Sequence, residues 1–271
     1  MDIRKRHEDN RRAWSEAAEV YMQDLDDRIA FLKAGGTNFC ESERPHLARI
    51  VPGCQRAIHL QCAGGTDTIS LWNLGIPEVI GVDISDRMIE VARKKSEAVG
   101  ANASWIRSDI LDTPAELDGT ADLVYTGRGA ICWIMDIEAW AAVVARLLRP
   151  GGVLFLFEGH PVTWLFDLNA AEPKLDPNPP FGDYFATEIG EEKGWPTTYV
   201  GDVLTEAEDL SVKHERQWNL GQVVNALIGA GLQIERLDEY PELYWETFPN
   251  WTPELRAKIP QTFSVIARKP I

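Results

Sequence analysis

The middle of the chain alternates between short apolar runs and longer amphipathic segments. Five apolar runs have the length of β-strands: RAIHLQC (56–62), EVIGVD (78–83), ASWIRSD (103–109), ADLVYT (121–126) and GGVLFLFE (151–158). Between them, apolar residues recur at helical spacing in DTISLWNLG (67–75), SDRMIEVARKKSEAVG (85–100) and DIEAWAAVVARLLRPGG (136–152). Nearly continuous apolar strands that alternate with helices are typical of a parallel sheet covered on both faces. The pattern therefore predicts an α/β domain whose strands end at one edge, where such sheets bind ligands.

Residues at the helix ends agree with this assignment. Ser85 and Asp136 stand where a helix N-cap is expected, and their side chains can accept hydrogen bonds from the first helical N–H groups. Gly75 and Gly100 follow the last apolar positions of two helices, and Pro150 follows the third. The helical boundaries are therefore predicted by capping chemistry as well as by periodicity.

The two ends of the chain extend this core. Helical spacing of Trp14, Ala17, Ala18, Tyr21, Leu25 and Ile29 predicts one helix over 8–34, which Gly35 and Gly36 end. A short helix is expected over 43–51. Near the C-terminus we expect a helix over 220–231 and strands over 232–240 and 262–270.

The segment 160–215 differs in composition from the rest. It is rich in Pro, Gly and aromatic residues, which makes it too long for an ordinary loop and too aromatic for a disordered linker. We interpret it as a lid or insertion that carries a few antiparallel strands, such as 197–204 and 210–218. No internal repeat or low-complexity segment accompanies it.

Composition restricts the partners. The chain has 271 residues, is 45% hydrophobic and has a net charge of −15. Because such an acidic surface repels phosphate backbones and anionic lipids, nucleic acid and membranes are not expected partners. No apolar run approaches the roughly 20 residues that span a bilayer, and the N-terminus lacks the apolar core of a signal peptide. The four cysteines form no metal-binding spacing, so we expect reduced thiols, no metal and a cytoplasmic location.

The stretch HLQCAGGTDT (59–68) resembles a nucleotide-binding loop between a strand and a helix. Its glycines allow a ligand to approach the backbone closely, but the last glycine of the dinucleotide fingerprint is missing and Asp67 lies at the helix start. A carboxylate there repels a diphosphate and tolerates a cation. S-adenosylmethionine carries no phosphate but has a sulfonium and an ammonium group, so it suits this loop. Asp83 and Asp109 end the next two strands, in positions that suit ribose hydroxyls and the adenine amino group.

Together these motifs resemble the core of class I S-adenosylmethionine-dependent methyltransferases. The matching pieces are HLQCAGGTDT, GVDIS, IRSDILD, ADLVYTGRGAICW and LLRPGGVLFLFE, in order and at suitable intervals. More narrowly, the chain resembles the bacterial small-molecule methyltransferases of the type 11 group, also through WSEAAEVY, EGHP, QWNLGQVVNALIGAGL and EYPE. The likeness is weak only between about 165 and 205.

The resemblance implies a Rossmann-like, doubly wound, mostly parallel seven-stranded sheet with an antiparallel last strand. It also implies one methyltransferase domain with four parts: an N-terminal helical cap (1–52), a cofactor-binding core (53–158), a lid or insertion (159–216) and the C-terminal part of the sheet (217–271). The activity implied is transfer of a methyl group to an oxygen, nitrogen or carbon atom of a small molecule.

The resemblance also assigns residues to the cofactor. They lie at the ends of the first four strands and on the N-terminal helix: Tyr21, Gln61, Ala63, Gly65, Asp83, Ile84, Met88, Asp109, Ile110, Thr126 and Gly127. Trp14 shares the helix face of Tyr21. One departure concerns Gln61, which replaces the usual acid at the end of the first strand. Its carbonyl can still accept a hydrogen bond from the ammonium group, and Asp67 is a second source of negative charge.

On the acceptor side, we predict that Arg128, Trp164, Tyr240 and Tyr244 bind the substrate. His160, which follows the fifth strand in EGHP, is the candidate general base because a neutral imidazole accepts a proton near pH 7. Glu158, His214 and Glu239 are weaker candidates.

Plainer explanations compete with each role. Asp83 also suits a helix N-cap, Met88 the core, and the helical face of Trp14 and Tyr21 simple packing. Arg128 also suits the surface, and a lone histidine such as His160 is more often structural than catalytic. At the level of the whole chain, two alternatives to a methyltransferase stay open: a nicotinamide-dependent oxidoreductase on a related sheet, and a non-catalytic binding module. The sequence does not identify the acceptor or the oligomeric state.

Overall fold

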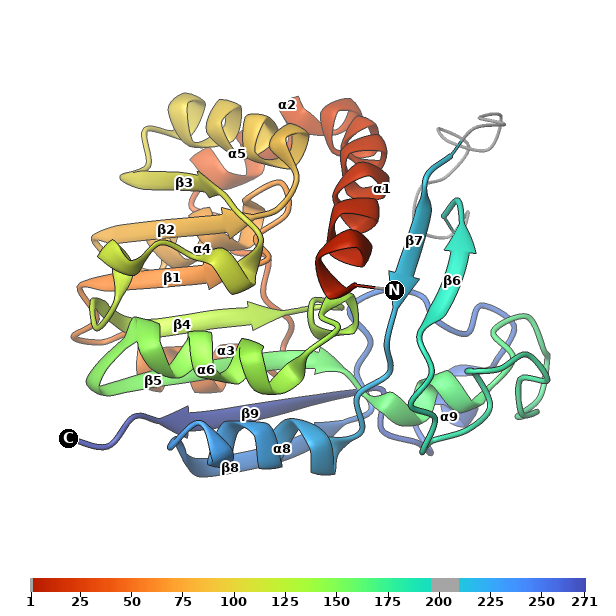
Figure 1. Ribbon diagram of the computed structural model, residues 1–271. Coiled ribbons are helices and arrows are strands. Elements are labelled where there is room, and N and C mark those ends of the chain that lie inside the picture. Colours follow the sequence, from red (N-terminus) through yellow and green to blue (C-terminus); the bar gives the residue numbers. More distant parts are fainter. Residues whose placement is uncertain (1, 196–209) are drawn as a thin grey trace.

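A twisted seven-stranded sheet forms the centre of the computed structural model, which describes residues 2–195 and 210–271 (Figure 1). The strand order is β3-β2-β1-β4-β5-β9-β8, and only β9 runs antiparallel to its neighbours. The strands are β1 (Arg56–Leu60), β2 (Glu78–Asp83), β3 (Ala103–Arg107), β4 (Ala121–Gly127), β5 (Leu148–Gly159), β8 (Gln233–Tyr240) and β9 (Thr262–Arg268). The predicted fold class is confirmed, including the antiparallel last strand.

Helices cover both faces of this sheet. Helices α6 (Ile137–Leu147) and α8 (Leu220–Gly229) pack on one face against β1, β4, β5 and β9. Helices α3 (Arg44–Ile50) and α4 (Thr66–Asn73) pack on the other face. Helix α5 (Asp86–Val99) lies against β3 at the sheet edge, and α9 (Pro253–Arg256) precedes β9. Short 3₁₀ helices complete the connections: η1 (Ile110–Asp112), η2 (Ala115–Leu117), η3 (Ile131–Trp133) and η4 (Pro161–Leu165).

The predicted caps are confirmed. The Ser85 hydroxyl accepts a hydrogen bond from the Met88 N–H, and the Asp136 carboxylate accepts one from the Ala139 N–H. Gly100 ends α5 with a φ of 77°, a left-handed conformation that favours glycine.

Two helices, α1 (Ile3–Gln23) and α2 (Leu25–Lys33), replace the single helix predicted over 8–34. The prediction was wrong because Asp24 leaves helical geometry, with φ −96° and ψ 12°, and periodicity alone does not detect such a short break. The bend lets α1 pass across the carboxyl ends of the strands while α2 packs on α5 (Figure 1).

A small antiparallel hairpin, β6 (Gly190–Lys193) with β7 (Val212–Glu215), lies beside α1. The Asn10 side chain donates to the His214 carbonyl at 2.9 Å and accepts from the His214 N–H at 2.6 Å, so α1 binds β7 as a neighbouring strand would. The strand predicted over 210–218 is shorter than expected. The one predicted over 197–204 lies outside the described residues.

Candidate functional site

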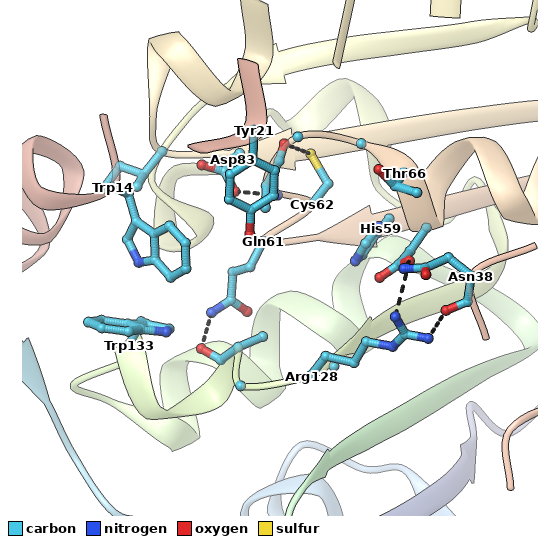
Figure 2. A pocket seen from close by; sticks show the side chains of 18 of the residues that line it. Trp14, Tyr21, Asn38, His59, Gln61, Cys62, Thr66, Asp83, Arg128 and Trp133 are labelled. Atoms are coloured by element: carbon cyan, nitrogen blue, oxygen red, sulfur yellow. Dashed lines mark hydrogen bonds and ion pairs between the residues drawn. The ribbon is translucent and has the colours of Figure 1, made fainter. Parts of the chain in front are cut away.

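A cavity of about 360 Å³ opens at the carboxyl ends of β1, β2, β3 and β4, beneath α1 (Figure 2). It is lined by the loop after β1, the ends of the next three strands and one face of α1. Predicted site residues that line it are Trp14, Tyr21, Gln61, Ala63, Gly65, Asp83, Ile84, Asp109, Ile110, Gly127, Arg128 and Tyr244. The fold therefore brings most of the predicted cofactor residues to one place.

The loop after β1 is tightly curled. Gln61, Ala63 and Gly65 all have positive φ angles, 56°, 44° and 75°. A Cβ atom on Gly65 would lie 2.5 Å from the Trp105 ring and 2.7 Å from Ala92, so only glycine fits there. The predicted strand over 56–62 consequently ends at Leu60.

Asp83 lies at the end of β2, and its carboxylate is held only by backbone. One oxygen accepts from the Ala63 N–H and the other from the Ser85 N–H, both at 2.8 Å. Burial raises the pKa of Asp83 to about 6, although these N–H groups act in the opposite direction. Within the described ranges no cationic side chain pairs with Asp83, so its remaining acceptor capacity is available to a ligand.

Asp109, at the next strand end, is already paired. It accepts a hydrogen bond from His7 at 2.8 Å and forms an ion pair with Arg4 at 2.9 Å. Because His7 accepts the Met135 N–H with its other nitrogen, the neutral ring donates to Asp109 through Nδ1. Burial raises the pKa of Asp109, but the bonds to His7 and Arg4 outweigh burial and lower it.

Arg128 is the centre of a buried ion cluster. Its guanidinium lies 3.0 Å from Glu43 and 3.4 Å from Asp67 and also donates to the Asn38 carbonyl (Figure 2). Glu43 is fully buried and accepts the Tyr125 hydroxyl at 2.8 Å. Arg128 therefore faces two carboxylates, and Asp67 is held in an ion pair within the protein rather than standing alone at the start of the helix.

Gln61 and Thr126 form a second link across the site. The Thr126 hydroxyl donates to the Gln61 side-chain carbonyl at 3.3 Å, and the Gln61 amide donates to the Ala130 carbonyl (Figure 2). The Thr126 side chain itself is fully buried and absent from the cavity lining. These bonds hold the Gln61 carbonyl oxygen in place, with one lone pair left to accept.

Besides Thr126, three predicted site residues line neither this cavity nor the one that adjoins it. Met88 is fully buried and packs with Ala17 and Ala18 under α1. The Tyr240 hydroxyl contacts His46 at 2.8 Å and Ser264 at 2.9 Å, on the sheet face covered by α3. His160 is also buried. The cofactor, substrate and base roles of these three residues were predicted from their positions in the sequence. Packing decides where each side chain points, and it directs all three away from the cavity.

Both ring nitrogens of His160 are engaged. Nδ1 accepts the Val162 N–H at 3.1 Å and Nε2 lies 2.7 Å from a Glu239 oxygen. The ring also packs edge-on against Phe263, with 6.0 Å between ring centroids. Its role as a general base has no supporting contact and stays a prediction.

A second cavity of about 580 Å³ adjoins the first. Both are lined by Trp14, Arg128, Gly129, Trp133, Tyr244 and Trp245. The second adds Trp164, Phe166, Phe181, Trp195 and Trp218, so nine of its lining residues in the described ranges are aromatic. Trp14, Trp133 and Trp195 contact one another with ring centroids 4.7–5.6 Å apart, at the boundary of the two cavities.

Trp133 and Lys95 were not among the predicted site residues, and Glu158 was predicted only as a weaker candidate for the general base. Trp133 and Lys95 line the first cavity, and Glu158 lines the second. Glu158 accepts N–H groups of Gly129, Ala130 and Ile131 at 2.7–3.0 Å, which fixes the loop after β4. Burial raises the pKa of Glu158 to about 7, although those N–H groups act in the opposite direction. Glu158 is a charged residue at the end of an apolar strand, and this feature of the sequence indicates a role in the site. The helical pattern around Lys95 contains no comparable indication.

Helices in the described ranges lack the combination of length and apolar character that crossing a bilayer requires.

Comparison with known proteins agrees with this geometry. Residues 57–152 match the family model described as a methyltransferase domain. Among curated proteins, the chain is 28% identical over 131 residues to a ubiquinone biosynthesis O-methyltransferase of Rhizobium johnstonii, covering 48% of this chain and 50% of that protein. It is 30% identical over 143 residues to a demethylmenaquinone methyltransferase of Staphylococcus aureus, covering 52% and 58%. The chain thus spans about half the length of these relatives.

Solved structures share the fold. An S-adenosylmethionine-dependent methyltransferase from Mesorhizobium loti superposes with a TM-score of 0.57 at 24% identity, covering 84% of this chain and 98% of that one. One from Clostridium acetobutylicum gives 0.53 at 16% identity, covering 80% and 84%. Residues 57–152 are therefore similar to a methyltransferase domain, and the chain has the fold of the S-adenosylmethionine-dependent methyltransferases.

Proposed function

We propose that this protein transfers a methyl group from S-adenosylmethionine to a small aromatic acceptor. The observation that carries the proposal is Asp83, a buried carboxylate at the end of β2 that is held by two N–H groups and lacks a cationic partner in the described ranges. Two adjoining cavities, one beside this carboxylate and one with aromatic walls, provide separate places for cofactor and acceptor.

In this proposal the first cavity holds S-adenosylmethionine. Asp83 accepts from the ribose hydroxyls, and Asp109 with Ile110 contacts the adenine. Gln61 offers its fixed carbonyl oxygen to the ammonium group, together with backbone groups of Thr126 and Gly127. Tyr21, Ala63, Gly65 and Ile84 shape the walls, and Met88 contributes through its packing with Ala17 and Ala18 of α1.

The second cavity holds the acceptor. Its aromatic walls suit a flat, largely apolar molecule, since aromatic rings prefer offset or edge contacts with one another. Two relatives have names that refer to ubiquinone biosynthesis and to demethylmenaquinone, which supports a quinol-like acceptor. Trp164 and Tyr244 line this cavity and Arg128 borders it. Tyr240 lies outside it and has no substrate contact in this proposal.

In methyl transfer the main contribution of the protein is to position the two reactants. When bound, S-adenosylmethionine supplies a methyl group on a sulfonium centre that is already a good leaving group. The chain contributes alignment of the acceptor and a pocket from which water is excluded. Trp14, Trp133 and Trp195 pack together where the cavities adjoin, and their apolar rings help to exclude water there.

We also propose that the chain acts as one methyltransferase domain in the cytoplasm, with the division at 52, 158 and 216 given above. The passage of α1 across the strand ends supports a cap that belongs to the core. All four cysteines are free thiols, which suits a reducing compartment.

Calorimetry with S-adenosylhomocysteine, S-adenosylmethionine and NADH tests the proposal. We expect micromolar or tighter binding of the two adenosyl ligands and none of NADH. Binding of NADH without S-adenosylhomocysteine would establish the oxidoreductase alternative. Tight S-adenosylmethionine binding without turnover of any phenolic or quinol acceptor would favour the binding module, for which the replacement of an acid by Gln61 is the supporting feature.

His160→Gln tests the predicted base. Removal of a general base lowers kcat by about 10²-fold or more. Because Glu239 and Val162 already occupy the ring, we expect a much smaller loss, with an unchanged pH dependence of kcat. A loss of 10²-fold or more, with the acidic limb of the pH profile removed, would instead establish His160 as the base.

A further inference from the structure

Three lysine or arginine side chains line the first cavity: Arg28, Lys95 and Arg128. Arg28 pairs with Asp24 at 2.8 Å, and Arg128 pairs with Glu43 and Asp67 at 3.0 and 3.4 Å. For Lys95 no carboxylate lies within 4 Å among residues 2–195 and 210–271. Lys95 is therefore the lysine or arginine of this cavity that has no carboxylate in direct contact within the described ranges.

The Lys95 ammonium is buried, with 1% of the residue exposed. It donates to the Thr66 hydroxyl at 2.9 Å and lies 5.7 Å from the centre of the Tyr21 ring. An ammonium group has three protons to donate, and burial of an unbalanced charge is costly. An anionic ligand that accepts from the remaining protons would therefore stabilise the buried Lys95 ammonium group.

The position of the ammonium is set by the cofactor loop. A Cβ atom on Gly64 would lie 3.2 Å from Lys95 Nζ and 2.8 Å from the Tyr21 ring. The missing side chain lets both groups approach the loop backbone closely. Lys95 thus reaches from α5 to the loop that curls around the predicted methionine end of the cofactor.

We propose that Lys95 is the counter-ion of the carboxylate on the amino-acid end of S-adenosylmethionine, and that it makes the site selective for ligands that carry this group. The inference rests on the proposed function. The carboxylate is the single anionic group of that ligand, and the other acidic side chains of the cavity would repel it. Asp83 and Lys95 then divide the recognition: Asp83 binds the nucleoside and Lys95 binds the amino acid.

The affinity then depends on pH. Burial lowers the pKa of Lys95 to about 8; Asp24 and Asp67 act in the opposite direction and Arg28 in the same one. The Tyr21 ring is the other titratable group that contacts the ammonium. Since only the charged amine attracts a carboxylate, affinity for S-adenosylhomocysteine falls as pH rises above about 8 in the wild type, and this fall is absent in Lys95→Met.

Calorimetry with two ligands tests the inference. S-adenosylhomocysteine carries both the carboxylate and the ammonium group, and its decarboxylated analogue carries only the ammonium group. We expect Lys95→Met to weaken S-adenosylhomocysteine binding by about 10- to 100-fold, the range for losing a hydrogen bond between charged groups, and to leave binding of the analogue unchanged. Lys95→Arg should retain much of the preference for the carboxylate. Lys94→Met is the matched control, because the neighbouring Lys94 is exposed and pairs with Glu90.

Equal weakening of both ligands by Lys95→Met would assign Lys95 a structural role in the loop and overturn the inference, and so would unchanged binding of both. Thermal melting of each variant shows whether it is folded, and Lys95→Gln replaces Lys95→Met should the latter not fold. If the wild type binds neither ligand, the proposed function itself fails. If it binds both equally, only the role of Lys95 fails.

Discussion

Asp83→Ala is expected to weaken binding of S-adenosylhomocysteine by about 100-fold, because hydrogen bonds to a buried charged acceptor contribute about 1.5–3 kcal/mol each. The same substitution should weaken 5′-methylthioadenosine equally, since that ligand keeps the ribose and lacks the amino-acid end. Calorimetry measures both affinities. This pattern is the opposite of the one expected for Lys95, so the two variants together locate the two ends of the ligand.

The pH dependence of Asp83 has a definite sign. The ionised carboxylate accepts from hydroxyls, and its pKa is raised by burial to about 6. Affinity should therefore fall as pH drops below about 6 in the wild type and not in Asp83→Ala. Asp86→Ala is the control, because Asp86 is exposed at the start of the next helix and pairs with Arg11. Unchanged binding in Asp83→Ala, with the fold intact by circular dichroism, would show that the ribose assignment is wrong.

Arg128→Met is expected to lower the free energy of unfolding by about 3–5 kcal/mol, the cost of removing one partner from a buried ion pair. Glu43 would be left fully buried without its cation, and Asp67 would lose its ion pair. Urea denaturation measures the loss. Arg87→Met is the comparison: Arg87 and Glu19 are both about half exposed and 3.5 Å apart, and such surface pairs contribute about 0–1 kcal/mol.

Two further measurements show whether Glu43 causes the loss. In Arg128→Met the buried Glu43 has a pKa above its ordinary value, so the folded state binds protons more tightly than the unfolded state. The deficit should therefore shrink as pH falls. Arg128→Met combined with Glu43→Gln should recover part of the stability. A deficit that is independent of pH and unaffected by Glu43→Gln would contradict the ion-cluster explanation.

The sequence predicted the sheet well because its strands and helices have strong, local patterns. Buried parallel strands are apolar throughout, and Ser85, Asp136 and Gly100 mark helix ends through contacts within four residues. The break between α1 and α2 at Asp24 was not predicted, because it changes the backbone geometry without changing the spacing of the apolar residues. The segment 160–215 was interpreted only coarsely, since its aromatic residues follow no period.

For the candidate site too, local sequence patterns predicted some features and missed others. By itself the sequence determined which backbone positions meet at the carboxyl edge of the sheet, because strand ends follow from local patterns and parallel strands end at the same edge. It therefore placed Gln61, Asp83 and Asp109 together. The tertiary structure alone decided which charged groups are in contact: Asp67 pairs with Arg128, whereas Asp83 and Lys95 line the cavity with no opposite charge within 4 Å in the described ranges. The physical reason is that ion pairing depends on distances of a few ångströms between residues far apart in the chain, such as Glu43 and Arg128, and no local pattern encodes those distances.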